Sequence, residues 1–161
     1  MILVFFASQG KNKELAYKIG DELSAQNKQC ELIDLVDLQL PLYDERQEEN
    51  YEPSNNLMEV LFKMKTSTSQ VYIAPEYNGS VPPVLNNFIA WTSRASKDWR
   101  ECFNEKKCLI ATHSGGGGAH VLMSMRSQFS FIGMNVLGRQ LLTNYNKELS
   151  VESLKASVRQ L

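Results

Sequence analysis

Cysteine and histidine are scarce in this sequence. Its 161 residues include three cysteines, Cys30, Cys102 and Cys108, and two histidines. No two cysteines have CxxC spacing, and an odd number cannot all pair within one chain. This scatter excludes a zinc site of the usual spacing. Reduced thiols, as in a cytoplasmic protein, are the simplest interpretation.

Long apolar runs and an excess of one charge are also absent. No apolar stretch approaches the roughly 20 residues that cross a bilayer. The first seven residues are apolar but have no basic leader or cleavage pattern, so they predict a strand and not a signal peptide. The 17 basic and 18 acidic residues give a net charge of −1, without the basic stripe that follows a phosphate backbone. We therefore expect a cytoplasmic protein with no membrane anchor and no nucleic-acid partner.

Short apolar runs alternate with stretches in which apolar residues recur every three or four positions. These patterns predict buried strands and amphipathic helices, respectively. We expect strands at residues 2–7, 30–35, 71–74, 108–112 and 135–137, and helices at 13–26, 57–64, 83–93, 122–132 and from 150 onward. Asn12 and Ser150 are the expected N-caps, and residues 44–52 an acidic, solvated connection.

Alternating strands and helices are typical of a parallel sheet with right-handed crossovers. The sequence thus predicts one α/β domain spanning residues 1–161. Such sheets bind ligands at the carboxyl ends of their strands, near the switch in strand order. The loops after the first, third and fourth strands are therefore the places to look for chemistry.

The first of these loops reads Ser8-Gln9-Gly10-Lys11-Asn12 and leads into a helix. Free amides and the positive end of the helix dipole favour an anion there. Ser8 and Asn12 can add donors, and Lys11 can add charge. An ordinary strand-to-helix turn capped by Asn12 is the alternative.

The loop after the fourth strand contains four consecutive glycines, from Gly115 to Gly118. It is not a dinucleotide fingerprint, because His120 occupies the place of the third required glycine and the run does not follow the first strand. No phosphate-binding P-loop motif occurs anywhere. Consecutive glycines indicate close approach of a ligand to the main chain, or else a flexible turn.

The middle loop is the most specific signal. Residues 74–82 read Ala-Pro-Glu-Tyr-Asn-Gly-Ser-Val-Pro, followed by Leu85-Asn86-Asn87 and Trp91. This segment resembles the signature of the NADPH-dependent FMN reductase family, which includes flavin, quinone, azo-dye and chromate reductases. Residues 12–16, 40–44 and 114–119 resemble further motifs of that family, in the same order and spacing, over roughly residues 1–140.

The resemblance implies a flavodoxin-like three-layer sandwich with a five-stranded parallel sheet of order 2-1-3-4-5. It also implies a site for FMN at the three loops. The first loop would hold the phosphate, the middle loop would border the isoalloxazine ring, and the glycine loop would meet the pyrimidine edge. The implied residues are Ser8, Gln9, Lys11 and Asn12; Pro75, Glu76, Tyr77 and Asn78; and His113, Ser114, Gly115 and Gly116.

The first loop departs from the family's pattern, and His113 has two alternative roles. The first loop is shorter than the family's usual G-S-x-R-x-G-S-x-N and lacks its arginine and second serine, and Lys11 is only a partial substitute. His113 can donate to a flavin carbonyl or can form a purely structural hydrogen bond.

The implied activity is oxidoreduction without a protein acid–base pair, because the flavin carries the chemistry. NADPH or NADH would reduce FMN, and a small oxidised acceptor such as a flavin or quinone would then be reduced. The resemblance also implies a homodimer or homotetramer. A flavodoxin-type electron carrier and a non-catalytic flavin-binding module are the alternatives.

Overall fold

The computed structural model describes residues 1–50 and 52–161. Its elements follow the chain in the order β1 (Ile2–Phe6), α1 (Lys11–Ala25), β2 (Cys30–Asp34), α2 (Glu45–Asn50), α3 (Asn55–Thr66), β3 (Ser69–Ile73), α4 (Pro83–Arg94), the 3-10 turn η1 (Trp99–Cys102), β4 (Lys107–Ser114), α5 (Ala119–Phe131), β5 (Asn135–Val136), β6 (Leu141–Asn144) and α6 (Val151–Val158).

The strands form one parallel sheet of order β2-β1-β3-β4-β5, with β6 also paired to β4. The flavodoxin-like order predicted from the sequence is confirmed. The edge beside β4 differs from the prediction, because two short strands share it. β5 pairs with Lys107 and Cys108, and β6 pairs with the last four residues of β4. Only two side chains of β6, Leu141 and Thr143, are buried, too few for the sequence to predict a strand there.

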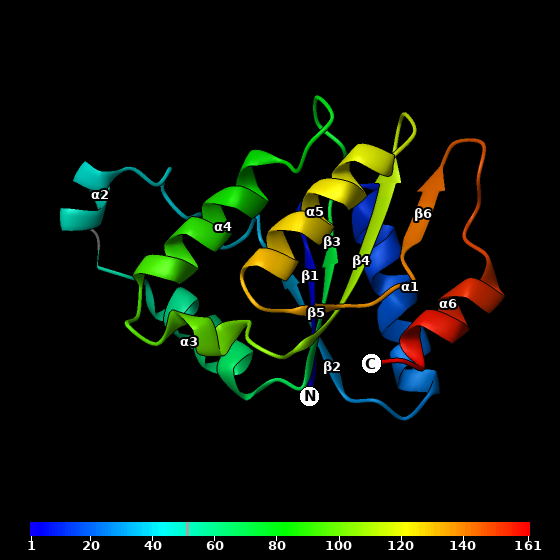
Figure 1. The fold of residues 1–161 in the computed structure, drawn as a ribbon, viewed down its shortest axis with the longest axis horizontal. Helices are drawn as coiled ribbons and strands as arrows, with labels where there is room; N and C mark the ends of the chain where they lie inside the picture. Colours follow the sequence, from blue (N-terminus) through cyan, green and yellow to red (C-terminus); the bar gives the residue numbers. More distant parts are fainter. Residues whose placement is uncertain (51) are drawn as a thin grey trace.

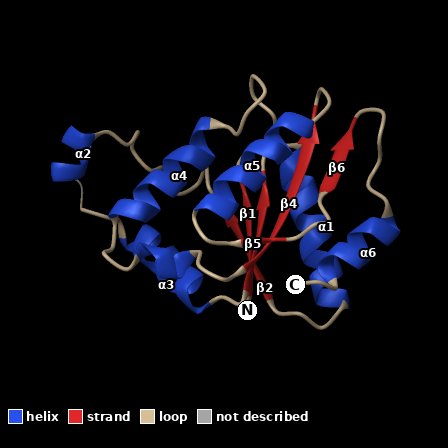
Figure 2. Ribbon diagram, in the orientation of Figure 1, coloured by secondary structure: helices blue, strands red, loops and turns tan. Residues whose placement is uncertain are grey.

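Helices cover both faces of the sheet, which makes three layers (Figures 1 and 2). On one face, α3, α4 and α5 pack on a core that includes the stacked rings of Phe5, Tyr72 and Phe129. On the other face, α1 and α6 cover Val4, Val71 and further apolar strand residues. The central strands β1, β3 and β4 are buried on both faces over most of their length, which is why they read as apolar runs.

The helix boundaries confirm most predictions and correct two. Ser150 is the N-cap of α6, where its Oγ accepts a hydrogen bond from Ser153 N. Asn12 is not an N-cap: Gly10 has that place, and Asn12 is buried inside the first turn of α1. The acidic connection at 44–52 contains the short helix α2, although residue 51 of that stretch lies outside the described residues.

Among the described residues, no helix is both long enough and apolar enough to cross a membrane.

Candidate cofactor site

The loops after β1, β3 and β4 lie next to one another at the carboxyl edge of the sheet. Phe6 at the end of β1 is level with Ile73 at the end of β3, and Ile73 is level with Ala111 of β4. The loops after β3 and β4 project together at the upper edge in Figure 1. The parallel register therefore brings the three predicted loops together, as expected for the switch point of such a sheet.

The first loop offers backbone amides more than side chains. Helix α1 begins after Gly10 with no side-chain cap, so its first amides are available to an anion at the positive end of the helix dipole. Gln9 is occupied, since its amide donates to Asp34 Oδ2 at 2.6 Å and accepts from Lys13 Nζ at 3.0 Å. Lys11 is paired with Glu14 at 2.9 Å, and that hydrogen bond lowers the pKa of the Glu14 carboxyl.

Asn12 links the first turn of α1 to the end of β4. Its Nδ2 donates to the His113 carbonyl at 3.0 Å, and its Oδ1 accepts from the His113 amide at 2.8 Å. Both ends of the buried side-chain amide are thus used on the backbone of β4. The two linked segments are 101 residues apart in sequence, and the contact of Asn12 with a cofactor stays a prediction.

The middle loop is a tight two-residue turn. Tyr77 and Ser80 exchange backbone hydrogen bonds of 3.0 Å in both directions. Between them, Asn78 and Gly79 have φ values of 51° and 73°. Positive φ at both positions is the geometry that Asn-Gly favours in a hairpin turn. Behind the turn Pro75 is buried, while the Tyr77 ring is 51% exposed beside the strand ends.

Glu76 fixes the middle loop to the start of α5. Its Oε2 accepts from Val121 N at 3.2 Å, one of the first amides of that helix, which takes the place of a side-chain cap. A Cβ placed on Gly116 would lie 3.8 Å from Glu76 Oε1. Ser114 Oγ accepts from Gly116 N at 3.1 Å. The structure therefore groups Glu76, Ser114 and Gly116.

The fold explains only one of the four consecutive glycines. Gly118 has φ 71°, a conformation that disfavours side chains, and a Cβ there would lie 3.1 Å from Thr112 Cγ2 and 3.2 Å from Ser114 Cβ, closer than ordinary van der Waals contact. The first three glycines, Gly115, Gly116 and Gly117, are exposed and are here called the outer glycines. Their φ values are ordinary, and a Cβ on each would approach no protein atom closer than 3.8 Å. Their lack of side chains leaves an open main-chain surface that fits a flat ring.

His113 lies beside this surface but its ring points elsewhere. β4 continues to Ser114, two residues beyond the predicted end, and side chains alternate along it. Ser114 therefore lies on the α5 side, and the His113 ring lies on the α1 side, 3.0 Å from Thr143 Oγ1 and edge-on to Tyr145. Sequence reasoning missed Thr143 and Tyr145, because nothing marked β6 as a strand.

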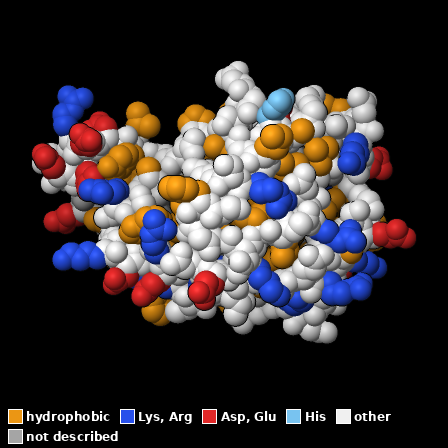
Figure 3. Space-filling model, viewed as in Figure 1, with side chains coloured by type: hydrophobic (Ala, Val, Ile, Leu, Met, Phe, Trp, Pro, Cys, Tyr) orange, Lys and Arg blue, Asp and Glu red, His pale blue; other side chains and the backbone are white. Residues whose placement is uncertain are grey.

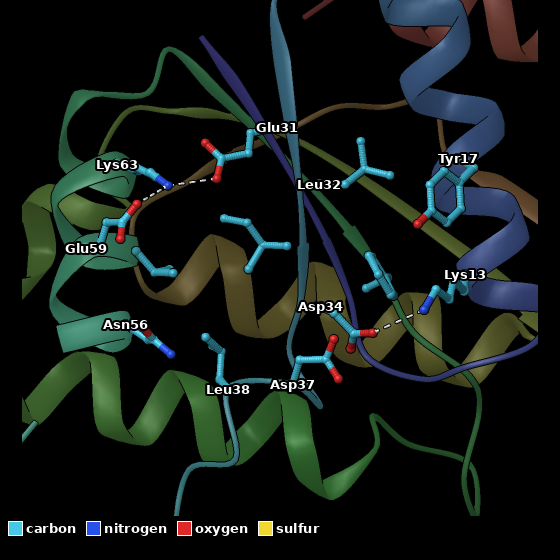
Figure 4. Close-up of a pocket in the computed structure, with 13 residues that line it drawn as sticks. Lys13, Tyr17, Glu31, Leu32, Asp34, Asp37, Leu38, Asn56, Glu59 and Lys63 are labelled. Carbon is cyan, nitrogen blue, oxygen red and sulfur yellow. Dashed lines mark hydrogen bonds and ion pairs between the residues drawn. The ribbon is translucent and has the colours of Figure 1, made fainter. Parts of the chain in front are cut away.

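A separate groove of about 400 Å³ follows the outer edge of β2, between α1 and α3 (Figure 4). Its lysines are matched by acids: Lys63 contacts Glu31 at 2.8 Å and Glu59 at 2.5 Å, and Lys13 lies 3.7 Å from Asp34. The hydrogen bonds to Glu31 and Glu59 raise the pKa of Lys63. This groove contains none of the predicted site residues and offers no free cation to an anionic ligand.

Known proteins resemble this chain in sequence and in fold. Over its whole length the chain is 27% identical to a Mycoplasma pneumoniae protein described as the uncharacterized protein MG342 homolog, covering 96% of that protein. Its fold is similar to FerB, a flavoenzyme NAD(P)H:(acceptor) oxidoreductase from Paracoccus denitrificans (TM-score 0.70, 17% identity, 85% of this chain and 75% of that one). It is also similar to an oxidoreductase from Corynebacterium diphtheriae (TM-score 0.73, 15% identity, 98% and 93%).

The two structural similarities, at such low identity, establish the fold alone. The family follows from the sequence, because the model of NADPH-dependent FMN reductases matches residues 1–148. FMN and a nicotinamide donor are the cofactors of such proteins, and the open glycine surface fits the first of them. The chain belongs to the NADPH-dependent FMN reductase family of flavin-dependent NAD(P)H oxidoreductases.

Proposed function

We propose that this protein binds FMN across the three loops and uses it to reduce flavins, quinones or similar small acceptors by two-electron transfer from NAD(P)H. The observation that carries the proposal is the open surface of the three outer glycines. The fold itself does not require glycine at these positions, and the middle of the three, Gly116, faces Glu76 of the middle loop. Family membership supports the reaction class.

Each loop has a distinct task in this proposal. The amides of the first turn of α1 bind the phosphate, assisted by the Ser8 hydroxyl, which has no hydrogen-bond partner within the described residues. Gly115, Gly116 and Ser114 border the pyrimidine edge, and the exposed Tyr77 ring packs beside the isoalloxazine. FMN, when bound, supplies the ring that accepts hydride. The protein positions it and leaves one face open.

Residues whose side chains already form hydrogen bonds or ion pairs within the protein hold the loops in position. Asn12 holds the first loop against β4 through two hydrogen bonds, and Glu76 holds the middle loop against α5. Gln9 and Lys11 are engaged within the protein. We therefore assign phosphate binding chiefly to the backbone, which accounts for the absence of the family's usual arginine in a short loop.

The experiment is NADPH oxidation by purified protein with FMN and a quinone acceptor. The proposal requires oxidation that depends on protein, FMN and quinone together. An electron carrier or a non-catalytic module gives no acceptor-dependent oxidation of NADPH. Tyr77→Ala is expected to weaken FMN binding, whereas Tyr17→Ala, which removes a ring 53% exposed on α1, is the matched control. Equal FMN affinity in the two variants would place the ring elsewhere.

The resemblance also implies a homodimer or homotetramer, and one face of the structure favours it. Met123 and Phe131 on α5 are 68% and 82% exposed and line a hollow of about 580 Å³ with other residues of α5, Asn86 of α4 and the end of the middle loop. Figure 3, which views the molecule from the α4 and α5 side, shows hydrophobic side chains on this surface. Exposed apolar patches mark interaction sites. Light scattering on wild type and Phe131→Lys tests this, and a monomeric wild type would contradict it.

A further inference from the structure

The outer edge of β2 presents backbone groups that have no neighbouring strand in the described part of the chain. β2 is the last strand of the sheet, and among the described strands it pairs only with β1. Just past its end, Leu35 N donates to Phe6 O of β1 at 3.0 Å. Successive residues of a strand turn their backbone groups to opposite sides, so the N–H and C=O groups of Cys30, Leu32 and Asp34 point away from β1. This edge can therefore receive one more strand.

The groove along this edge has room for an extended segment. α3 forms one wall and α1 the other, and the groove holds about 400 Å³ (Figure 4). A strand added to a sheet lies about 4.8 Å from its neighbour, which places it between these two walls. The side chains of β2 point to the walls in turn, Glu31 toward α3 and Leu32 toward α1 (Figure 4).

The groove is acidic. Its charged lining residues are four acids and two lysines: Glu31, Asp34, Asp37, Glu59, Lys13 and Lys63. The groove therefore has an excess of two negative charges, whereas the net charge of the whole chain is only −1. Lys63 is shared between Glu31 and Glu59, and Asp37 forms no ion pair with any residue that the structure describes. This charge favours a basic occupant.

The same charge argues against pairing with a second copy of the chain. Two β2 edges placed side by side would bring two acidic grooves together, and like charges directly opposite each other destabilise a strand pair. β2 itself, with the sequence Cys-Glu-Leu-Ile-Asp, contains no basic residue that could compensate. The occupant is therefore a segment of different composition.

The two walls differ in chemistry. Glu31 and Glu59 make the α3 side acidic, whereas Leu32 and the Tyr17 ring, which is 53% exposed, give the α1 side an apolar surface. The side chains of an added strand alternate between the same two walls.

We propose that the groove binds an extended basic segment of another protein, which adds to β2 as a further strand, with lysine or arginine toward α3 and apolar side chains toward α1. In this mode of recognition, backbone hydrogen bonds supply affinity and the alternate side chains supply specificity. The inference is independent of FMN binding.

The test uses a fluorescein-labelled hexapeptide amide in which lysine and valine alternate. Fluorescence anisotropy measures its affinity, and NMR measures amide hydrogen exchange in the protein. We expect saturable binding, with exchange at the amides of Cys30, Leu32 and Asp34 slowed about tenfold or more, because these amides gain hydrogen bonds. The amides of Glu31 and Ile33 already face β1 and should change little.

Charge variants locate the peptide in the groove. Asp37→Asn and Glu59→Gln should each weaken binding about two- to fivefold at low salt, as loss of an exposed ion pair does. Glu152→Gln removes an acid that is also exposed on a helix, α6, and is the matched control that should bind like wild type.

A peptide of the same composition, with its lysines first and its valines last, controls for charge alone. Equal affinity for the two peptides would reveal unspecific attraction and overturn the inference. Absence of saturable binding up to about 1 mM would do the same, as would full affinity in the Asp37→Asn, Glu59→Gln double variant. If the outward amides of β2 become protected without peptide as the protein concentration rises, the edge pairs with a second copy and the inference is wrong.

Discussion

Alanine substitutions in the glycine loop separate the needs of the fold from the needs of a ligand. In Gly118→Ala, the residue keeps a φ of 71°, which costs about 1–2 kcal/mol for a side chain. The new methyl would also lie 3.1 Å from Thr112 Cγ2 and 3.2 Å from Ser114 Cβ, and such overpacking costs about 1–3 kcal/mol. We expect a total loss of about 2–5 kcal/mol in the free energy of unfolding.

Gly116→Ala should behave in the opposite way. Its φ is ordinary and its nearest neighbour, Glu76 Oε1, is at van der Waals distance, 3.8 Å. The folded state should therefore tolerate the methyl, and the smaller entropy of the unfolded chain should add about 0.4–1 kcal/mol of stability. The affinity for FMN should fall about tenfold or more, because the methyl occupies the surface that the ring needs and even 1.4 kcal/mol is a factor of ten.

Two assays on the apoprotein and its FMN complex measure these effects. Urea unfolding followed by circular dichroism gives the stabilities, and quenching of flavin fluorescence gives the dissociation constants. The reasoning is refuted if Gly116→Ala destabilises the apoprotein as much as Gly118→Ala does. It is equally refuted if Gly116→Ala binds FMN as tightly as wild type, since the open surface would then have no ligand.

Three further predictions concern positioning and stability. Asn12→Ala should cost about 1–3 kcal/mol in urea unfolding, because the amide of His113 loses its partner, and a wild-type value would show that the loops need no such tie. Glu76→Ala should cost about 1 kcal/mol through loss of its bond to Val121 N, and Glu76→Gln, which keeps an acceptor, should restore most of it. Burial raises the pKa of Cys102 to about 11 from 9.0, so its contribution to stability is complete below pH 9.0 and is lost as pH rises toward 11. Between pH 8 and 10.5 wild type should therefore lose about 2 kcal/mol more than Cys102→Ala, and parallel pH profiles would contradict this.

The sequence predicts the framework well because burial leaves a strong pattern. Leu57, Val60, Leu61 and Met64 recur at helical spacing, because one face of α3 is buried. The β1, β3 and β4 strands appear as apolar runs, because both of their faces are buried. β6 was missed because its short segment has no such run, and its place at the edge depends on pairing with β4.

The site residues could be placed in loops from the sequence, but not oriented. The direction of the His113 ring follows from the continuation of β4 to Ser114, which apolar pattern alone does not indicate. The role of Asn12 depends on a partner 101 residues away. The Asn78-Gly79 turn, by contrast, has a local signal, since this dipeptide favours positive φ at both positions.

The central claim is that one crevice, formed by the first turn of α1, the Tyr77–Ser80 turn and the outer glycines, binds FMN. A crystal structure after soaking with FMN tests it most directly. We predict density for a planar ring against Gly115 and Gly116, with the phosphate at the amides that follow Gly10. An empty crevice, or flavin bound in another part of the molecule, would contradict the claim.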